Sequence, residues 1–184
     1  PDPPKENSEK PRYIWIDAAA NFKDFANNRD NIIRDLTLAK DVGFTDIVVD
    51  IRPTSGDILY KSSVPGIEQV KWVGAWVNGA YTKVERTATW DYLQAFIDEG
   101  QKLGLRVHAG FNTMVGGNSS GLGNQGILYR DPAKKEWATY ENLSIGIVNT
   151  MDRGSGTKFF NPVNVEVQNY LCDLLKDLAK YNLD

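Results

Sequence analysis

The sequence predicts an α/β fold built on a parallel sheet, because runs of strand-forming residues alternate with amphipathic helical patterns along its 184 residues. Three strand-then-helix units follow one another. The turns from each helix to the next strand are tight, whereas the connections from strands to helices are long. Apolar residues make up 41% and charged residues 24% of the chain, which is enough apolar material for a packed core.

Three strands are expected from runs of β-branched and aromatic residues. The first is short, and the second is apolar on both faces, as in a buried parallel strand. The third carries the single histidine of the chain. The expected strands cover residues 13–17, 47–52 and 105–112.

Each strand is followed by a helix with apolar residues at the spacing that one buried helical face requires. Side-chain caps and αL-type stop residues give the expected limits of these helices. In chain order these are Asn28 or Asp30 to Gly43, Thr89 to Gly104, and Asn164 to Asn182. Cys172 falls beside Leu171 in the third helix, where a buried and inert sulfur is expected.

The two long strand-to-helix connections, residues 53–88 and 113–163, are expected to carry function. They follow the carboxyl ends of parallel strands, where α/β enzymes place their sites. Three units are under half of a (β/α)8 barrel, which takes roughly 250 residues. The chain is therefore a small open sheet or, as we favour, part of a barrel.

Five polar side chains lie on one face of the expected sheet, toward the carboxyl ends of the strands: Asp17, Asp50, Arg52, His108 and Asn112. A charged side chain within a strand needs a partner or a ligand. These residues are therefore expected to converge on one pocket floor. A structural ion pair with a hydrogen-bonded core histidine is the alternative.

The first long connection contains acidic and aromatic residues suited to a sugar: Asp57, Tyr60, Trp72, Trp76 and Tyr81. Indole and phenol rings offer apolar faces with polar rims, which match the faces and hydroxyls of sugars. The alternative is that Trp72 and Trp76 anchor the loop to the body of the domain.

The spacing of Gly121, Gly123 and Gly126 matches the glycine spacing of the dinucleotide-binding motif. That motif needs a strand before it and a helix after it, and here an extended stretch is expected to follow. A mobile lid is the better interpretation. No nucleotide cofactor is predicted.

Charge and composition exclude several other classes of function. The net charge of −3 provides no basic surface for nucleic acid. One cysteine and one histidine exclude a multi-cysteine or histidine-rich metal site, and no apolar run reaches the length of a membrane span. Neither a metal nor any other cofactor is predicted.

The proline-rich, polar start of the chain, residues 1–11, is expected to be a flexible linker before the folded region 12–184. Because no initiator methionine precedes it, a removed signal peptide and export of the protein are expected.

Three segments resemble a bacterial family of family-10-like glycosyl hydrolases, which is related to the α-amylase-type barrels. They are residues 45–62 (TDIVVDIRPTSGDILYKS), 105–113 (LRVHAGFNT) and 160–171 (FNPVNVEVQNYL). The resemblance extends from about Arg12 to the last residue. It implies a (β/α)8 TIM barrel, of which this chain covers about the first three βα units. It also implies an exported protein, periplasmic, extracellular or anchored at the cell surface as a lipoprotein, that acts on a polysaccharide or oligosaccharide.

The residues that match the family patterns R-P-x-G-D-x-L-Y and H-A-x-x-N are Arg52, Asp57, Tyr60, His108 and Asn112. The first pattern holds one extra residue here, and Gly110 stands where relatives often carry a larger side chain. The family pattern places the catalytic carboxylates beyond Asp184. Arg52, His108 and Asn112 are therefore expected to bind sugar hydroxyls or position a carboxylate, and Asp17 and Asp50 to contact the ligand.

Four functions remain open at this point. A glycosidase is favoured, and a non-catalytic carbohydrate-binding barrel at the cell surface is the main alternative. A structural or interaction domain and a sugar-phosphate barrel are the others.

Overall fold

A three-stranded parallel sheet forms the base of the structure, a computed structural model that describes residues 10–184. Its strands are β1 (Tyr13–Ile16), β2 (Asp46–Arg52) and β5 (Arg106–Phe111), in the order β1-β2-β5. The predicted α/β class and the positions of the three strands are confirmed. The sheet is open within the described residues, and most of the predicted linker lies outside them.

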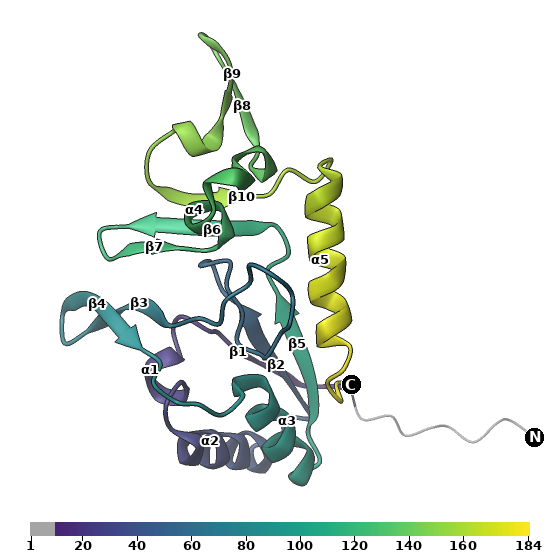
Figure 1. Cartoon of the computed structure of the whole chain (residues 1–184). Helices are drawn as coiled ribbons and strands as arrows, with labels where there is room; N and C mark the ends of the chain where they lie inside the picture. Colours follow the sequence, from purple (N-terminus) through teal and green to yellow (C-terminus); the bar gives the residue numbers. More distant parts are fainter. Residues whose placement is uncertain (1–9) are drawn as a thin grey trace, which may run out of the picture.

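Two helices cover one face of this sheet, α2 (Arg29–Asp41) and α3 (Tyr92–Lys102), at the bottom of Figure 1. The side chains of Ile47, Val49 and Ile51 are fully buried beneath them. Gly100 lets α3 approach closely, because a Cβ there would lie 2.7 Å from the Val107 side chain. The hydrophobic core therefore lies between this sheet and its helices.

The helix limits follow their capping residues. Asn28 caps α2 as expected, with its side chain accepting from the backbone N–H groups of Asp30 and Asn31. The cap of α3 is Asp91 and not Thr89, because the Asp91 carboxylate accepts from the N–H of Gln94. Asn164 caps α5 (Val165–Leu178), which ends four residues before the expected Asn182.

The long connections hold hairpins that the sequence analysis did not resolve. The first contains β3 (Trp72–Val77) and β4 (Ala80–Glu85), and α1 (Phe22–Phe25) follows β1. The second contains, in order, β6 (Val115–Ser120), β7 (Gly123–Gln125), α4 (Ile127–Arg130), η1 (Pro132–Trp137), β8 (Tyr140–Leu143), β9 (Gly146–Asn149), η2 (Thr150–Asp152) and β10 (Gly156–Phe159). The glycine pattern forms the β6–β7 turn and β7, and a short helix follows it in place of the expected extended stretch.

A second core lies above the parallel sheet, between α5 and the antiparallel sheet β10-β6-β7. It is built around the aromatic side chains of Trp137, Phe160 and Tyr170, whose rings contact one another with centroids 5.3–6.2 Å apart. The chain thus has two packed parts, which we call its layers: the parallel sheet with its helices, and the antiparallel sheet beside it (Figure 1).

Arg52 joins the two layers. Its guanidinium donates to the carbonyl oxygens of Asn112, Thr113 and Val115, which lead from β5 into β6. The same group packs against the rings of Phe111 and Phe160, at 5.3 and 5.6 Å from their centroids. Arg52 is completely buried, and among residues 10–184 no carboxylate forms a salt bridge with it.

The other face of the parallel sheet is open, and two aromatic side chains lie on it. Tyr13 and Trp15 are 55% and 61% exposed. The Trp15 ring occupies the space above Gly110, where a Cβ would come within 2.9 Å of it. Gly110, which departs from the family pattern, thereby accommodates a tryptophan from β1.

Two further observations concern α5 and the helices in general. Cys172 is exposed, so the expectation of a buried sulfur is wrong. It lies on the side of α5 that faces away from Leu171 and Leu174. No helix within residues 10–184 has both the length and the apolar character needed to cross a bilayer.

We predict that Arg52→Met lowers the free energy of unfolding by about 3–5 kcal/mol, since it leaves buried carbonyl groups without a donor. Urea unfolding of the full chain, followed by circular dichroism, measures this loss. The control is Arg34→Met, which removes an exposed pair with Asp35 and should cost less than about 1 kcal/mol. Equal losses in the two variants would contradict the joining role of Arg52.

Candidate functional site

A cleft lies at the carboxyl ends of β1 and β2, between the β3–β4 and β6–β7 hairpins. It consists of two adjoining cavities that share Trp72 and Gln125 in their walls. One, the charged cavity, has a volume of about 270 Å³. The other, the neutral cavity, has a volume of about 130 Å³. Both hairpins project to the same side of the molecule (Figure 1).

An ion-pair network forms the wall of the charged cavity. Arg130 Nη2 lies 2.9 Å from Asp57 Oδ1, and Arg130 Nε lies 3.5 Å from Glu68 Oε1. Glu68 also pairs with Lys71 at 2.6 Å. Two carboxylates and two cations thus neutralise one another, and Tyr129 adds a ring beside them.

Asp57 is the buried member of this network. Burial raises the pKa of its carboxyl group, whereas the hydrogen bond and charge of Arg130 act in the opposite direction. Its Oδ2 also accepts from the backbone N–H of Gly126 at 3.2 Å. Asp57 therefore ties the loop after β2 to the end of β7 and orients Arg130 in the cavity wall.

The neutral cavity has a different chemistry. Its aromatic walls are Trp72 and Tyr81, and its polar groups are hydroxyls and amides: Thr54, Ser55, Asn118, Ser120 and Gln125. Within the described part of the chain, no ionisable acid or base of the Asp, Glu, Lys, Arg or His type lines it. Flat rings beside uncharged donors and acceptors suit a polyhydroxylated ligand.

Close backbone approach makes this cleft possible. A Cβ at Gly126 would lie 2.4 Å from Gly117 Cα and 2.4 Å from the Ser55 carbonyl oxygen. Gly126 also has a φ of +86°, which L side chains rarely adopt. Gln125 then donates from Nε2 to the Trp72 carbonyl at 2.7 Å and so holds the two hairpins together.

The structure does not bring the five predicted polar side chains to one floor. His108 binds toward the amino ends of the strands: its Nε2 lies 2.8 Å from Asp46 Oδ1, and its Nδ1 lies 3.0 Å from the Asp184 carbonyl. Arg106 pairs with the same Asp46 carboxylate at 2.6 Å. A structural ion pair beside a hydrogen-bonded histidine is thus present, formed by Arg106 and Asp46.

Asp50 and Asn112 lie together at the opposite end of the sheet. Asn112 Nδ2 donates to the Arg52 carbonyl at 2.9 Å and lies 3.5 Å from Asp50 Oδ1. Burial raises the pKa of the Asp50 carboxyl, and the nearby charge of Asp17 adds to this effect. Asp17 itself is exposed and accepts from the N–H groups of Ala19 and Ala20.

Two other predicted site residues lie in the interior. Arg52 is fully buried at the joint described above, and Tyr60 is fully buried with its hydroxyl donating to the Leu174 carbonyl at 3.0 Å. Trp76 lies outside both cavities and is 71% exposed, with its ring against Tyr81. Of the predicted residues, Asp57, Trp72 and Tyr81 line the cleft.

Three residues of the cleft were not predicted from the sequence: Arg130, Gln125 and Asn118. Their signal is weak, because each is a single polar residue in a long connection with no periodic pattern. One signal could have identified Arg130. Asp57 precedes a buried segment and therefore needs a cationic partner, and Arg130 ends a short apolar run that follows a glycine turn.

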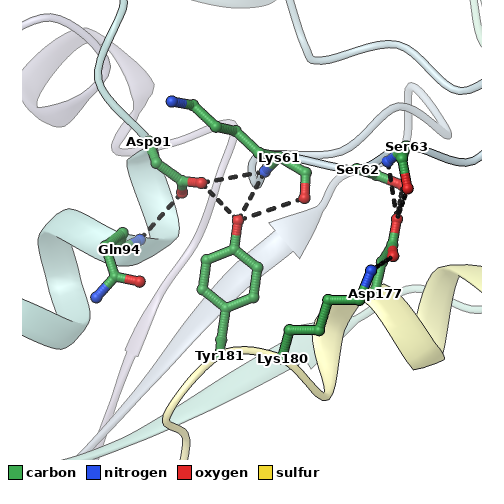
Figure 2. Close-up of a pocket in the computed structure, with 8 residues that line it drawn as sticks. All are labelled: Lys61, Ser62, Ser63, Asp91, Gln94, Asp177, Lys180 and Tyr181. Carbon is green, nitrogen blue, oxygen red and sulfur yellow. Dashed lines mark hydrogen bonds and ion pairs between the residues drawn. The ribbon is translucent and has the colours of Figure 1, made fainter.

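A larger and more open hollow lies on the outer surface between α3 and α5 (Figure 2). Its polar groups are engaged with one another. Tyr181 donates to the Asp91 carboxylate and accepts from the N–H of Lys61 at 2.8 Å. Asp177 accepts from Ser62 Oγ at 2.6 Å and pairs with Lys180. This hollow is therefore a seam that fastens the end of α5.

The match to a family model decides the family of this chain. The glycosyl hydrolase-like 10 model matches residues 10–184, which is nearly the whole chain. The chain belongs to the glycosyl hydrolase-like 10 family. Among its relatives is an S-layer-related protein of Niallia circulans, 27% identical over 98% of this chain. The chain spans 11% of the length of that relative.

A solved structure supports the fold of this glycosyl hydrolase-like 10 chain. The crystal structure of a hypothetical protein from Ruminiclostridium thermocellum ATCC 27405 matches with a TM-score of 0.53 and 16% identity. The match covers 94% of this chain and 72% of that one. The mixed α/β fold is thus shared, and the predicted family is confirmed.

We predict that Asp46→Asn makes unfolding less sensitive to acid. Arg106 first, and then Thr45 and His108, hold the pKa of Asp46 well below its ordinary value of 3.8, against the effect of burial. A lowered pKa in the folded state stabilises the protein above the unfolded pKa, and this contribution is lost as the pH falls. Urea midpoints of the parent should therefore fall more steeply than those of the variant between about pH 5 and pH 2. Parallel curves would contradict this account.

We predict that Tyr181→Phe lowers the free energy of unfolding by about 1–2 kcal/mol, because the Asp91 carboxylate and the Lys61 N–H lose a partner. Thermal and urea unfolding measure the loss. Tyr140→Phe, on the exposed β8 strand, is the matched control and should change stability little. If Tyr181→Phe instead left stability unchanged, the outer hollow would not be a structural seam.

Proposed function

We propose that this region binds a glycan in the cleft around Trp72, as part of a glycosyl hydrolase-like protein. The observation that carries the proposal is the neutral cavity, where Trp72 and Tyr81 stand beside amide and hydroxyl groups. Such a lining matches the apolar faces and the hydroxyls of a sugar ring at the same time. The family to which the chain belongs supports the same class of ligand.

We further propose that the parallel sheet is part of a (β/α)8 barrel. Three observations support it. The helices lie on one face of the sheet, as on the outside of a barrel. The other face carries the exposed rings of Tyr13 and Trp15, which neighbouring strands would cover. Asp184 pairs with the outer edge of β5, its N–H donating to the Val107 carbonyl at 3.0 Å.

Hydrolysis of a glycosidic bond is the proposed activity of the whole protein. It needs two carboxyl groups, about 5–5.5 Å apart for retention or roughly 6.5–9.5 Å apart for inversion. Asp57 and Glu68 are engaged by Arg130 and serve to position it. We therefore assign Asp57, Glu68 and Arg130 to the substrate-binding site. We expect the catalytic carboxylates elsewhere in the protein. Reducing-sugar release from a polysaccharide panel tests the activity.

Non-catalytic glycan binding at the cell surface is the second candidate. It is favoured by the relative described as an S-layer-related protein, of which this chain spans a small part. Export and a carbohydrate partner are common to both candidates. Binding of polysaccharide without release of reducing sugar would select the second.

We predict that Trp72→Ala weakens glycan binding about tenfold or more, because it removes the wall shared by both cavities. Affinity electrophoresis of the full chain in gels containing neutral polysaccharides identifies the bound glycan, and titration calorimetry gives its affinity. Circular dichroism confirms that the variant is folded.

The control for this experiment is Gln94→Ala, which changes the outer hollow of Figure 2 and should leave affinity unchanged. The reverse result, with binding lost in Gln94→Ala and kept in Trp72→Ala, would place the site in the outer hollow. That result would overturn the proposal.

A further inference from the structure

We infer that the site extends from the neutral cavity along Tyr81 and Trp76 on the β3–β4 hairpin, and that it binds several consecutive units of a neutral glycan chain. This inference rests on the proposed function, and it adds the length and the charge class of the ligand. The hairpin presents a continuous row of three rings, Trp72, Tyr81 and Trp76, which we call the aromatic row.

The two faces of the hairpin have different roles. Val73 is buried and Val84 packs against the main core, so this face is directed inward. Side chains alternate along a strand, and the aromatic row therefore lies on the outward face. The turn between the strands is Asn78-Gly79, both with positive φ, which keeps the pairing of Trp76 with Tyr81 in register.

The aromatic row is continuous with the cavity. Tyr81 lines the neutral cavity and lies across Gly74, where a Cβ would come within 2.2 Å of the phenol oxygen. Its ring is 5.7 Å from that of Trp76, centroid to centroid. Trp72 and Trp76 are four residues apart on one strand, so their Cα atoms lie about 13 Å apart. That distance exceeds the length of one sugar ring.

Packing within the described residues does not account for a tryptophan at position 76. It is 71% exposed and Tyr81 is 50% exposed, and within the described residues these rings contact each other. Trp15 is exposed to a similar degree, yet its ring covers Gly110 of the parallel sheet. A tryptophan that stands out from a hairpin beside a cavity has the geometry of a stacking platform.

The charge around the cleft favours a neutral glycan. An anionic polymer requires an excess of cationic side chains, and here Arg130 and Lys71 are matched by Asp57 and Glu68. Lys83, on the outward face of the hairpin, lies 4.5 Å from the centroid of the Trp72 ring. Apart from Lys83, the groups that face the ligand in the neutral cavity and along the aromatic row are rings, amides and hydroxyls.

The test compares oligosaccharides of increasing length by titration calorimetry. Neutral series from disaccharide to hexasaccharide are used, namely β-1,4-linked glucose, xylose and N-acetylglucosamine and α-1,4-linked glucose, with oligogalacturonides as the acidic series. The full chain should bind one neutral series with affinity that rises with length. Trp76→Ala should bind its hexasaccharide about 3- to 10-fold more weakly and its shortest bound member within about 2-fold of the parent.

Two controls accompany this comparison. Trp76→Tyr keeps a flat ring and should retain most of the gain with length. Tyr140→Ala removes an exposed ring from β8, away from the cleft, and should bind every length as the parent does.

The outcomes separate the inference from the proposed function. If Trp72→Ala loses binding while Trp76→Ala keeps the full gain with length, the inference is overturned and the proposed function stands. Equal or tighter binding of the acidic series overturns the charge class. If the parent binds none of the oligosaccharides, both the proposed function and the inference fail.

Discussion

The position of the cleft depends on one buried guanidinium group. Arg52 ends β2, and its donors hold the three carbonyls through which the chain passes from the parallel sheet into β6. The start of β6 then determines where Asn118 and Ser120 lie, and through β7 it determines where Gln125 meets Trp72. Arg52 thus fixes this segment of the chain by donating to backbone carbonyl oxygens. Among residues 10–184, no carboxylate forms a salt bridge with it.

The cleft lies between rigid elements. The residues that hold these elements in place are therefore different from the residues that would contact a ligand. Asp57 and Gly126 join the loop after β2 to the end of β7, and Tyr60 joins the same loop to α5. Residues that the family pattern shares can therefore serve mainly to hold the scaffold, as Arg52 and Tyr60 do here. The groups in contact with a ligand would then come from the hairpins. This arrangement allows one scaffold to carry different ligand preferences.

The sequence allowed the parallel strands and the helices to be predicted, because periodicity and caps are local signals. Residue alternation also placed Asp50, Arg52 and His108 on the correct face. It could not say which neighbour each would bind. Arg52 binds the carbonyl oxygens of the segment that leads into β6, and His108 binds Asp46 near the opposite end of the sheet. The β3–β4 hairpin was missed although its Asn78-Gly79 turn is a local signal in the sequence. The place of β7, in contrast, depends on the close tertiary contact of Gly126 with Gly117.

The contact of Trp15 with Gly110 has a consequence for the history of the family. The two residues belong to strands on either side of β2, so they are distant in the chain but share one volume. A side chain at position 110 would displace the ring of Trp15. In a change that starts from this pair of residues, the clash is avoided when the tryptophan is replaced first. Relatives with a larger residue at the position of Gly110 should therefore lack the tryptophan, and the two positions should vary together among sequences.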